Sequence, residues 1–199
     1  MALKHVEPEM HYVHPTPHSP NSRLPIIVYR GALQDTSAES ILSTIEPNAW
    51  LKGGQWKTYK IPHFHSNTHE CYGIIKGSST YLLGKSPIDP DTYENGETIG
   101  FVLHVKVGDV FVLPAGITHR SLDSEGDYEF IGLYPGTATP EGNGEPRFDM
   151  HWGKESVEET KRLAQQVEAV PIPDKDPLYG LGGPLPRIWG EVLSRQRLL

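Results

Sequence analysis

Two histidines and a glutamate stand at spacings that suit a metal site. His63 and His65 are two residues apart, so on a strand both imidazoles point to the same face. Glu70 follows a polar turn at 66–68, which can bring its carboxylate back beside the two rings. Imidazole and carboxylate donors together suit a first-row divalent ion. The segment therefore offers three donors to one ion.

A third imidazole comes from a distant segment. In 108–119, a Pro/Gly turn at 114–116 stands immediately before His119, which we expect on a strand. His69 has the opposite strand parity to Glu70, so if Glu70 faces the ion, His69 faces away. We interpret His69 as a structural residue that supports the site, and not as a ligand.

The same alternation nominates the residues of a ligand pocket around these donors. The inward-facing neighbours are Tyr59 and Ile61 beside His63, Tyr72 and Ile74 beside Glu70, and Ile117 and Ser121 beside His119. We expect a mostly apolar wall with two phenols and one hydroxyl, which is typical of small-molecule sites. In this pocket Glu70 and Tyr72 are the candidate catalytic residues, and the other five are candidate substrate-binding residues. Cys71 and His104 are interpreted as structural, and His151 is given no role.

The elements that must position these side chains are mostly short strands separated by Gly, Pro, Asn and Asp. The sequence predicts strands at 24–29, 56–65, 70–75, 80–83, 99–107, 110–113, 119–122 and 128–134. Such a series favours an antiparallel sandwich or barrel. Apolar residues at helical spacing predict helices at 37–46 and 156–170. The polar stretch 85–97 predicts an enlarged loop, either a lid or a surface excursion.

The chain has 199 residues, 37% of them hydrophobic, which is enough for one domain with a core. We expect three parts. They are a Pro/His-rich N-terminal arm at 1–23, extended and solvated; a barrel with an N-terminal helix at 24–136; and a region at 137–199 with a Gly/Pro linker (137–147), a helix and an apolar tail packed on the barrel.

Charge and composition exclude several classes of partner. The formal net charge of −7 provides no basic surface for nucleic acid or anionic lipid. No apolar run approaches the roughly 18 residues of a membrane span, and the N-terminus lacks a signal-peptide pattern. We therefore expect a cytoplasmic protein with a small-molecule partner. The single cysteine cannot form an intramolecular disulfide, and we expect it to be packed in the core.

The two histidine segments together resemble the two motifs of the cupin superfamily. The first motif is matched by His63, His65, Glu70 and Gly77, and the second by Gly108, Pro114, Gly116 and His119. The resemblance implies an all-β fold, a double-stranded β-helix or jelly-roll barrel of the RmlC-like type, here with a few peripheral helices. It also implies that His63, His65, Glu70 and His119 bind one metal. The tail at 176–189 and the run at 65–70 resemble the YjlB-like single-domain cupins.

Three imidazoles and one carboxylate leave up to two positions open on an octahedral ion. Our first hypothesis is a metal-dependent oxidoreductase, of dioxygenase type, that acts on a small oxygenated organic molecule. The ion would be Fe, Mn, Ni, Co or Zn. The alternatives are a redox-neutral isomerase, epimerase or lyase that uses the ion as a Lewis acid, and a non-catalytic small-molecule or metal-binding barrel.

We also expect a homodimer. The apolar strand at 24–29 follows an arm that is too polar to pack on its own core, so the arm can reach a neighbouring subunit. The alternative is that the tail covers this sheet edge within the monomer.

Overall fold

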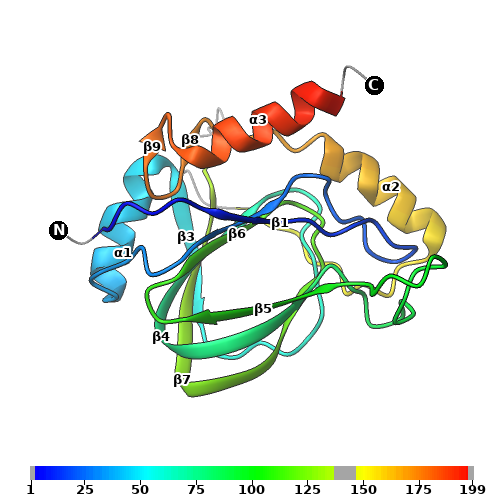
Figure 1. The fold of residues 1–199 in the computed structure, drawn as a ribbon, viewed down its shortest axis with the longest axis horizontal. Coiled ribbons are helices and arrows are strands. Elements are labelled where there is room, and N and C mark those ends of the chain that lie inside the picture. Colours follow the sequence, from blue (N-terminus) through cyan, green and yellow to red (C-terminus); the bar gives the residue numbers. More distant parts are fainter. Residues whose placement is uncertain (1–2, 137–146, 197–199) are drawn as a thin grey trace.

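Antiparallel strands curve into a jelly-roll barrel in the computed structural model, which describes residues 3–136 and 147–196 (Figure 1). The strands are β1 (Glu9–His11), β2 (Ile26–Tyr29), β3 (Trp50–Trp56), β4 (Glu70–Leu83), β5 (Phe101–Lys106), β6 (Val110–Leu113) and β7 (His119–Pro135), with a small pair β8 (Lys175–Asp176) and β9 (Gly180–Leu181). The main sheet runs β1-β2-β6-β4-β7-β3, and β5 pairs with β4. The predicted fold class is confirmed. The predicted linker at 137–147 falls almost entirely outside the described residues.

Two long strands replace four predicted short ones. The segments 70–75 and 80–83 are one strand, β4, and 119–122 and 128–134 are one strand, β7. The register between β4 and β7 shifts near Lys76, where Gly77 has a φ of +66°. A Cβ at Gly77 would lie 2.3 Å from the carbonyl oxygen of Glu125. The glycine therefore bends the strand at a bulge, and does not end it as the sequence pattern suggested.

The predicted strand at 56–65 is wrong. β3 ends at Trp56, and residues 57–62 form no strand. Pro62 lacks the N–H that a ladder requires. His63 is instead held by an isolated bridge, in which its backbone exchanges two hydrogen bonds with the backbone of His119, at 3.2 and 2.9 Å.

The prediction of a solvated N-terminal arm is also wrong. β1 pairs with β2 of the same chain, and Val13 and Asn21 are buried. The side-chain amide of Asn21 donates to the carbonyl oxygens of His14 and Gly84, both at 2.8 Å. The polar arm packs because its side chains satisfy buried backbone groups. The arm thus covers the edge of β2 in its own chain, so the argument that the arm reaches a neighbouring subunit no longer holds. The homodimer stays a prediction, which light scattering at micromolar concentration would test.

The loop at 85–97 lies against this arm. The Thr16 hydroxyl donates to the Asp89 carboxylate at 2.6 Å, and the Tyr93 hydroxyl donates to the His14 carbonyl at 3.1 Å. None of its residues lines the histidine cavity described below. The loop is a surface excursion in this structure.

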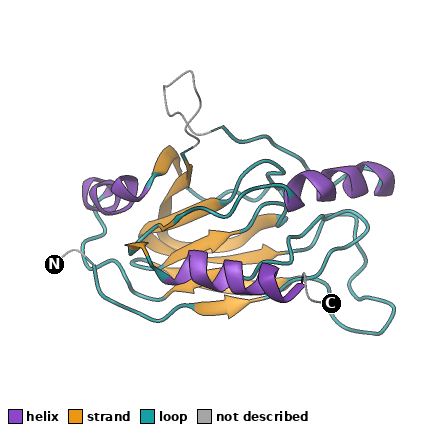
Figure 2. Ribbon diagram, turned by 90° about the horizontal axis from the view of Figure 1, so that it is seen from above, coloured by secondary structure: helices purple, strands orange, loops and turns teal. Residues whose placement is uncertain are grey.

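Helices lie outside the strand layers (Figure 2). They are α1 (Ala38–Ile45), followed by the short 3-10 helix η1 (Glu46–Asn48), α2 (Val157–Glu168) and α3 (Pro184–Gln196). The two predicted helices are confirmed as α1 and α2, each capped by a serine, Ser37 and Ser156. The sequence pattern missed α3, whose two prolines, Pro184 and Pro186, lie in the first turn, where a missing N–H costs nothing.

Two clusters of buried side chains form the core. One fills the barrel and includes Tyr72, Ile74, Ile117 and Phe130. The other lies between the sheet and the helices and includes Ile27, Ile41, Trp50, Cys71, Leu185 and Trp189. Cys71 is therefore packed in the core, as predicted, and it lies on the side of the sheet that faces the helices. The C-terminal tail covers this outer face of the sheet. No helix in the described ranges combines the length and apolar character of a membrane span.

Candidate metal centre

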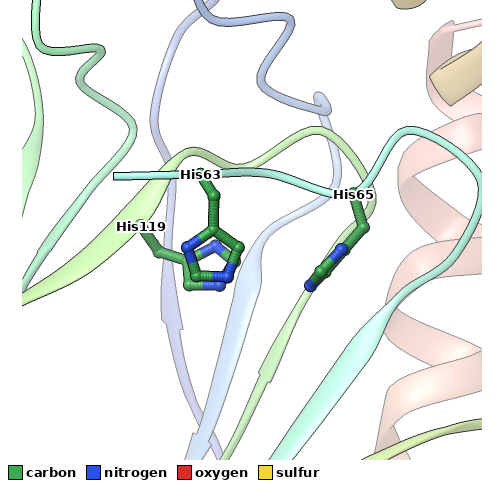
Figure 3. Close-up of side chains that lie close together, drawn as sticks. All are labelled: His63, His65 and His119. Carbon is green, nitrogen blue, oxygen red and sulfur yellow. The ribbon is translucent and has the colours of Figure 1, made fainter. Parts of the chain in front are cut away.

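Three histidines from two distant segments meet at one end of the barrel (Figure 3). Their ligand nitrogens all lie within 4.8 Å of one another. The residues His63, His65 and His119 are 7%, 4% and 2% exposed. The bridge between the backbones of His63 and His119 brings the two segments together, with ring centroids 4.2 Å apart.

Glu70, the first residue of β4, adds a carboxylate to the three rings. Its Oε2 atom lies 3.2 Å from Nε2 of His65 and 3.3 Å from Nε2 of His119. The structure thus brings the four predicted ligand residues together. The donor set is mixed nitrogen and oxygen, which suits a first-row divalent ion.

The hydrogen bonds on the far side of each ring fit a metal. Nδ1 of His63, His65 and His119 lies 3.0, 2.5 and 2.8 Å from the backbone carbonyl oxygens of Ile61, Asp149 and Ile117. A carbonyl oxygen only accepts, so each Nδ1 carries the proton and donates it. In the neutral rings Nε2 then holds the lone pair that a metal needs. Nε2 of His119 is buried, and it has no hydrogen-bond partner with acceptable geometry among the described residues.

Burial and neighbouring charges shift the pKa values of the candidate ligands in ways that favour binding of a cation. Burial, together with the nearby His119 ring, lowers the pKa of His63 to about 3, so this ring is neutral at pH 7. Burial alone lowers the pKa of His65, but the Glu70 carboxylate outweighs it and raises the pKa. Burial alone raises the pKa of Glu70, but His65 and His119 together hold it well below its usual range. Glu70 is therefore ionised at neutral pH, and its negative charge favours a cation beside the three rings.

Two phenols hold the Glu70 carboxylate in place. The Tyr134 hydroxyl donates to Oε1 at 2.7 Å, and the Tyr72 hydroxyl donates to Oε2 at 3.0 Å. Tyr72 was a sequence candidate, but Tyr134 was not. Strand parity could not nominate Tyr134 from His119, because β7 contains register shifts between the two.

The segment 148–151 crosses beside the histidines and positions His65. Its Asp149 accepts from the backbone N–H of Ser66 at 2.6 Å, while its carbonyl accepts from the His65 ring. The backbones of Phe64 and His151 exchange two hydrogen bonds. Sequence reasoning assigned no role to this segment, since it follows a Gly/Pro-rich stretch and is too short to show a strand pattern.

A cavity of about 300 Å³ opens onto the four candidate ligands. Of the pocket residues expected from strand parity, Tyr59 and Tyr72 line it. Seven further lining residues were not expected: Trp56, Tyr81, Arg120, Phe130, Tyr134, Phe148 and Met150.

The other expected pocket residues lie elsewhere. Ile61 is 53% exposed, so the expectation that it faces inward is wrong, because 57–62 is not a strand. Ile74 and Ile117 are buried inside the barrel and do not line the cavity. Ser121 is buried opposite Tyr81 and does not line it either, and its hydroxyl has no hydrogen-bond partner among the described residues.

His69 points away from the cluster, as predicted. Its Nδ1 accepts from the backbone N–H of Ala115 at 3.0 Å, and its Nε2 donates to the Pro171 carbonyl at 3.2 Å. Burial lowers its pKa to about 4. The neutral ring therefore ties the turn before His119 to the segment that follows α2. His104 is exposed on β5, and His151 packs against Phe64.

Comparison with known proteins identifies a relative that aligns with most of the chain. The chain is 31% identical over 166 residues to the uncharacterized protein YjlB of Bacillus subtilis, and the match covers 83% of this chain and 86% of YjlB. Solved structures match only at low similarity. RmlC from Streptococcus suis, in complex with dTDP-D-xylose, is 12% identical over 67% of this chain and 73% of RmlC, with a TM-score of 0.33. Procruciferin, an 11S globulin from Brassica napus, is 12% identical over 59% of this chain, with a TM-score of 0.33, and the chain spans only 30% of its length. No family model matches the chain. On its similarity to YjlB, its jelly-roll barrel and its two histidine motifs, the chain belongs to the YjlB-like cupins.

Proposed function

We propose that this chain binds one divalent transition metal, Fe, Mn, Ni, Co or Zn, through His63, His65, Glu70 and His119. We propose further that it is a metal-dependent enzyme of oxidoreductase type acting on a small oxygenated organic molecule. The observation that carries the proposal is the convergence of three buried imidazoles, each with Nδ1 bonded to a backbone carbonyl, in the wall of one cavity.

The residues around the cavity have separate tasks. A bound first-row ion supplies Lewis acidity and, where it is redox-active, one-electron steps toward dioxygen. The ionised Glu70 is positioned to take a proton from a ligand that enters the cavity, since Oε2 faces the histidines. The Tyr72 hydroxyl, 3.0 Å from Oε2, can stabilise that carboxylate or pass a proton to it. The aromatic walls exclude water, which strengthens these electrostatic interactions.

Two other functions use the same site. A redox-neutral isomerase, epimerase or lyase needs only Lewis acidity and the base Glu70. A non-catalytic binding barrel needs neither open coordination positions nor a base. The presence of a buried, ionised carboxylate in the wall of a largely apolar cavity favours the enzymatic functions over simple binding.

Oxygen uptake separates these functions. Protein loaded with Fe²⁺ or Mn²⁺ under anaerobic conditions is mixed with small hydroxy acids, enols and phenols in air-saturated buffer, and dissolved oxygen and products are measured together. We expect oxygen uptake that depends on one substrate class and that the His119→Ala variant lacks. Product formation without oxygen uptake would identify the redox-neutral function. Metal binding without turnover of any compound would contradict an enzyme of oxidoreductase type.

A further inference from the structure

Aromatic side chains make up most of the wall above the candidate metal ligands, and they point to a class of ligand. This inference rests on the proposed metal site and adds the chemistry of the molecule that enters it. The relevant rings form two pairs. Tyr134 and Phe148 stack with centroids 4.5 Å apart and planes 15° apart, and Trp56 and Phe130 lie 5.8 Å apart at 44°.

Both aromatic pairs lie beside the candidate ligands. Phe148 is 5.2 Å from the His65 ring, and Phe130 is 4.8 Å from the Tyr72 ring. Along β7, Phe130, Gly132 and Tyr134 alternate onto one face. A Cβ at Gly132 would lie 2.6 Å from the Trp56 ring and 3.2 Å from Oε1 of Glu70. The glycine therefore lets the Trp56 indole approach the Glu70 carboxylate. Phe130 of one aromatic pair and Tyr134 of the other lie on either side of Gly132 along β7.

The rings also differ in depth. Tyr134 and Phe130 are buried, whereas Phe148 is half-buried and Trp56 is exposed. An entering molecule thus meets Trp56 and Phe148 first and the candidate metal ligands last. Ring faces and edges prefer to contact other rings in offset or edge-to-face geometry. Walls of this kind favour a flat ring over a saturated one of equal size.

The charges in the cavity favour one negative charge on that ring. Glu70 is the acidic residue of the wall, and Arg120 is its one side chain of fixed positive charge. A divalent ion with three neutral imidazoles and the Glu70 carboxylate retains one positive charge. Because the candidate ligands are buried, that charge is best balanced by one anionic ligand atom.

The volume limits the size. About 300 Å³ is at the lower end of the range for small-molecule sites. One ring with a short substituent fits, but a nucleotide or a polycyclic molecule does not.

We infer that the cavity takes a single-ring aromatic molecule with one anionic oxygen, held with that oxygen toward His63, His65 and His119 and its ring against Trp56 and Phe148.

Three hydroxamates test the inference without turnover, because they share one metal-binding group. Benzohydroxamate carries an aromatic ring, cyclohexanecarbohydroxamate carries a saturated ring of similar size, and acetohydroxamate carries none. Each is titrated calorimetrically into Zn²⁺-loaded protein whose metal content has been measured. Offset aromatic contacts stabilise a bound ring beyond what its apolar area contributes, so we expect benzohydroxamate to bind about tenfold more tightly than the cyclohexyl compound.

Variants locate the preference in the wall. Trp56→Leu and Phe148→Leu keep an apolar side chain but remove the ring, so each should reduce the tenfold preference without changing acetohydroxamate binding. Tyr12→Leu removes an exposed ring on the N-terminal arm and should leave all three affinities unchanged. Equal binding of the two ring compounds to fully loaded protein, or an unchanged preference in both wall variants, would overturn the inference while the metal site stands. If the chain does not bind Zn²⁺, the titrations are made with whichever of Fe²⁺, Mn²⁺, Ni²⁺ and Co²⁺ it binds, and a chain that binds none of the five ions would overturn the proposed function, and this inference with it.

Discussion

Tyr134 donates a hydrogen bond to Oε1 of Glu70 at 2.7 Å across 64 residues of sequence. Tyr72 donates to the other carboxylate oxygen at 3.0 Å. Each oxygen of Glu70 thus accepts a hydrogen bond from a phenol, and together the two bonds restrict rotation of the carboxylate. A carboxylate fixed in this way presents Oε2 to the two rings that it faces, His65 and His119. Residues that orient a ligand in this manner are part of a metal site even though they do not touch the ion.

Removing the Tyr134 hydroxyl should therefore weaken metal binding. Tyr134→Phe keeps the ring and its stacking on Phe148, but it frees Oε1 of Glu70. Changes of this kind cost about 10–100-fold in metal affinity, and we expect the lower half of that range because Tyr72 remains. Competition with a chromophoric chelator measures the Zn²⁺ affinity. Tyr128→Phe is the control, since Tyr128 bonds to Tyr81 and not to Glu70. A similar affinity loss in both variants would refute the role given to Tyr134.

His69 is adjacent to the candidate ligand Glu70, yet removing its side chain should affect metal binding much less than removing that of His119. His119→Ala removes a ligand nitrogen and should lower the metal content strongly. His69→Ala should leave it largely intact, because both nitrogens of His69 are bonded to the backbone of other segments. Elemental analysis of the two purified variants, with circular dichroism to verify folding, distinguishes them. Equal metal loss from two folded variants would show that the assignment of the ligands is wrong.

Asp176 should be a major anchor of the C-terminal tail. Its buried carboxylate accepts from the Tyr29 hydroxyl and from the backbone N–H groups of Leu178, Tyr179 and Leu185, the last of these at the start of α3. Asp176→Ala leaves these donors without a partner, and each such loss costs about 1–3 kcal/mol. We expect the free energy of unfolding to fall by about 3 kcal/mol or more in total, since several of these donors are buried. Asp174→Ala, at an exposed position two residues earlier, should change it little. Urea unfolding of both variants tests this, and equal stability would count against the anchor.

The metal-free protein should lose stability in mild acid through His69. Burial lowers the pKa of His69 from 6.5 to about 4 in the folded chain. As the pH falls below 6.5, the unfolded chain takes up a proton at this residue, whereas the folded chain does so only near pH 4. The stability present above pH 6.5 is therefore lost progressively down to pH 4. At pH 5 the loss from this residue is about 2 kcal/mol.

Urea unfolding in the presence of a chelator, at pH 7.5 and pH 5, measures this effect. His69→Gln keeps hydrogen-bonding groups without titrating, so the fall in stability between the two pH values should be smaller in this variant. The same fall in wild type and variant would contradict the assignment.

The ligand residues were predictable because the chemistry fixes their types and the motifs fix their spacing. His63 and His65 converge as expected, although the predicted strand between 57 and 62 is absent and a single bridge to His119 does the positioning. The bridge follows from pairing between segments more than fifty residues apart, which local periodicity does not encode.

The cavity wall was harder to predict for the same reason. Tyr134 reaches Glu70 only because bulges change the parity of β7 after His119, and Phe148 and Met150 come from a segment with no regular structure. Alternation fails at Ile61 because 57–62 is a loop. Ile74 and Ile117 do lie inside the barrel, but alternation does not tell how far from the cavity a residue lies. The N-terminal arm was misjudged because its composition is polar, while its burial depends on partners such as Gly84 that lie far along the chain.

The metal content of the protein tests the central claim most directly. The chain is purified without a histidine tag, stripped with a chelator, reconstituted with each of Fe²⁺, Mn²⁺, Ni²⁺, Co²⁺ and Zn²⁺, desalted and subjected to elemental analysis. The account predicts close to one equivalent per chain for at least one of these ions, with release on acidification as the imidazoles become protonated. Less than about a tenth of an equivalent with every ion would contradict it.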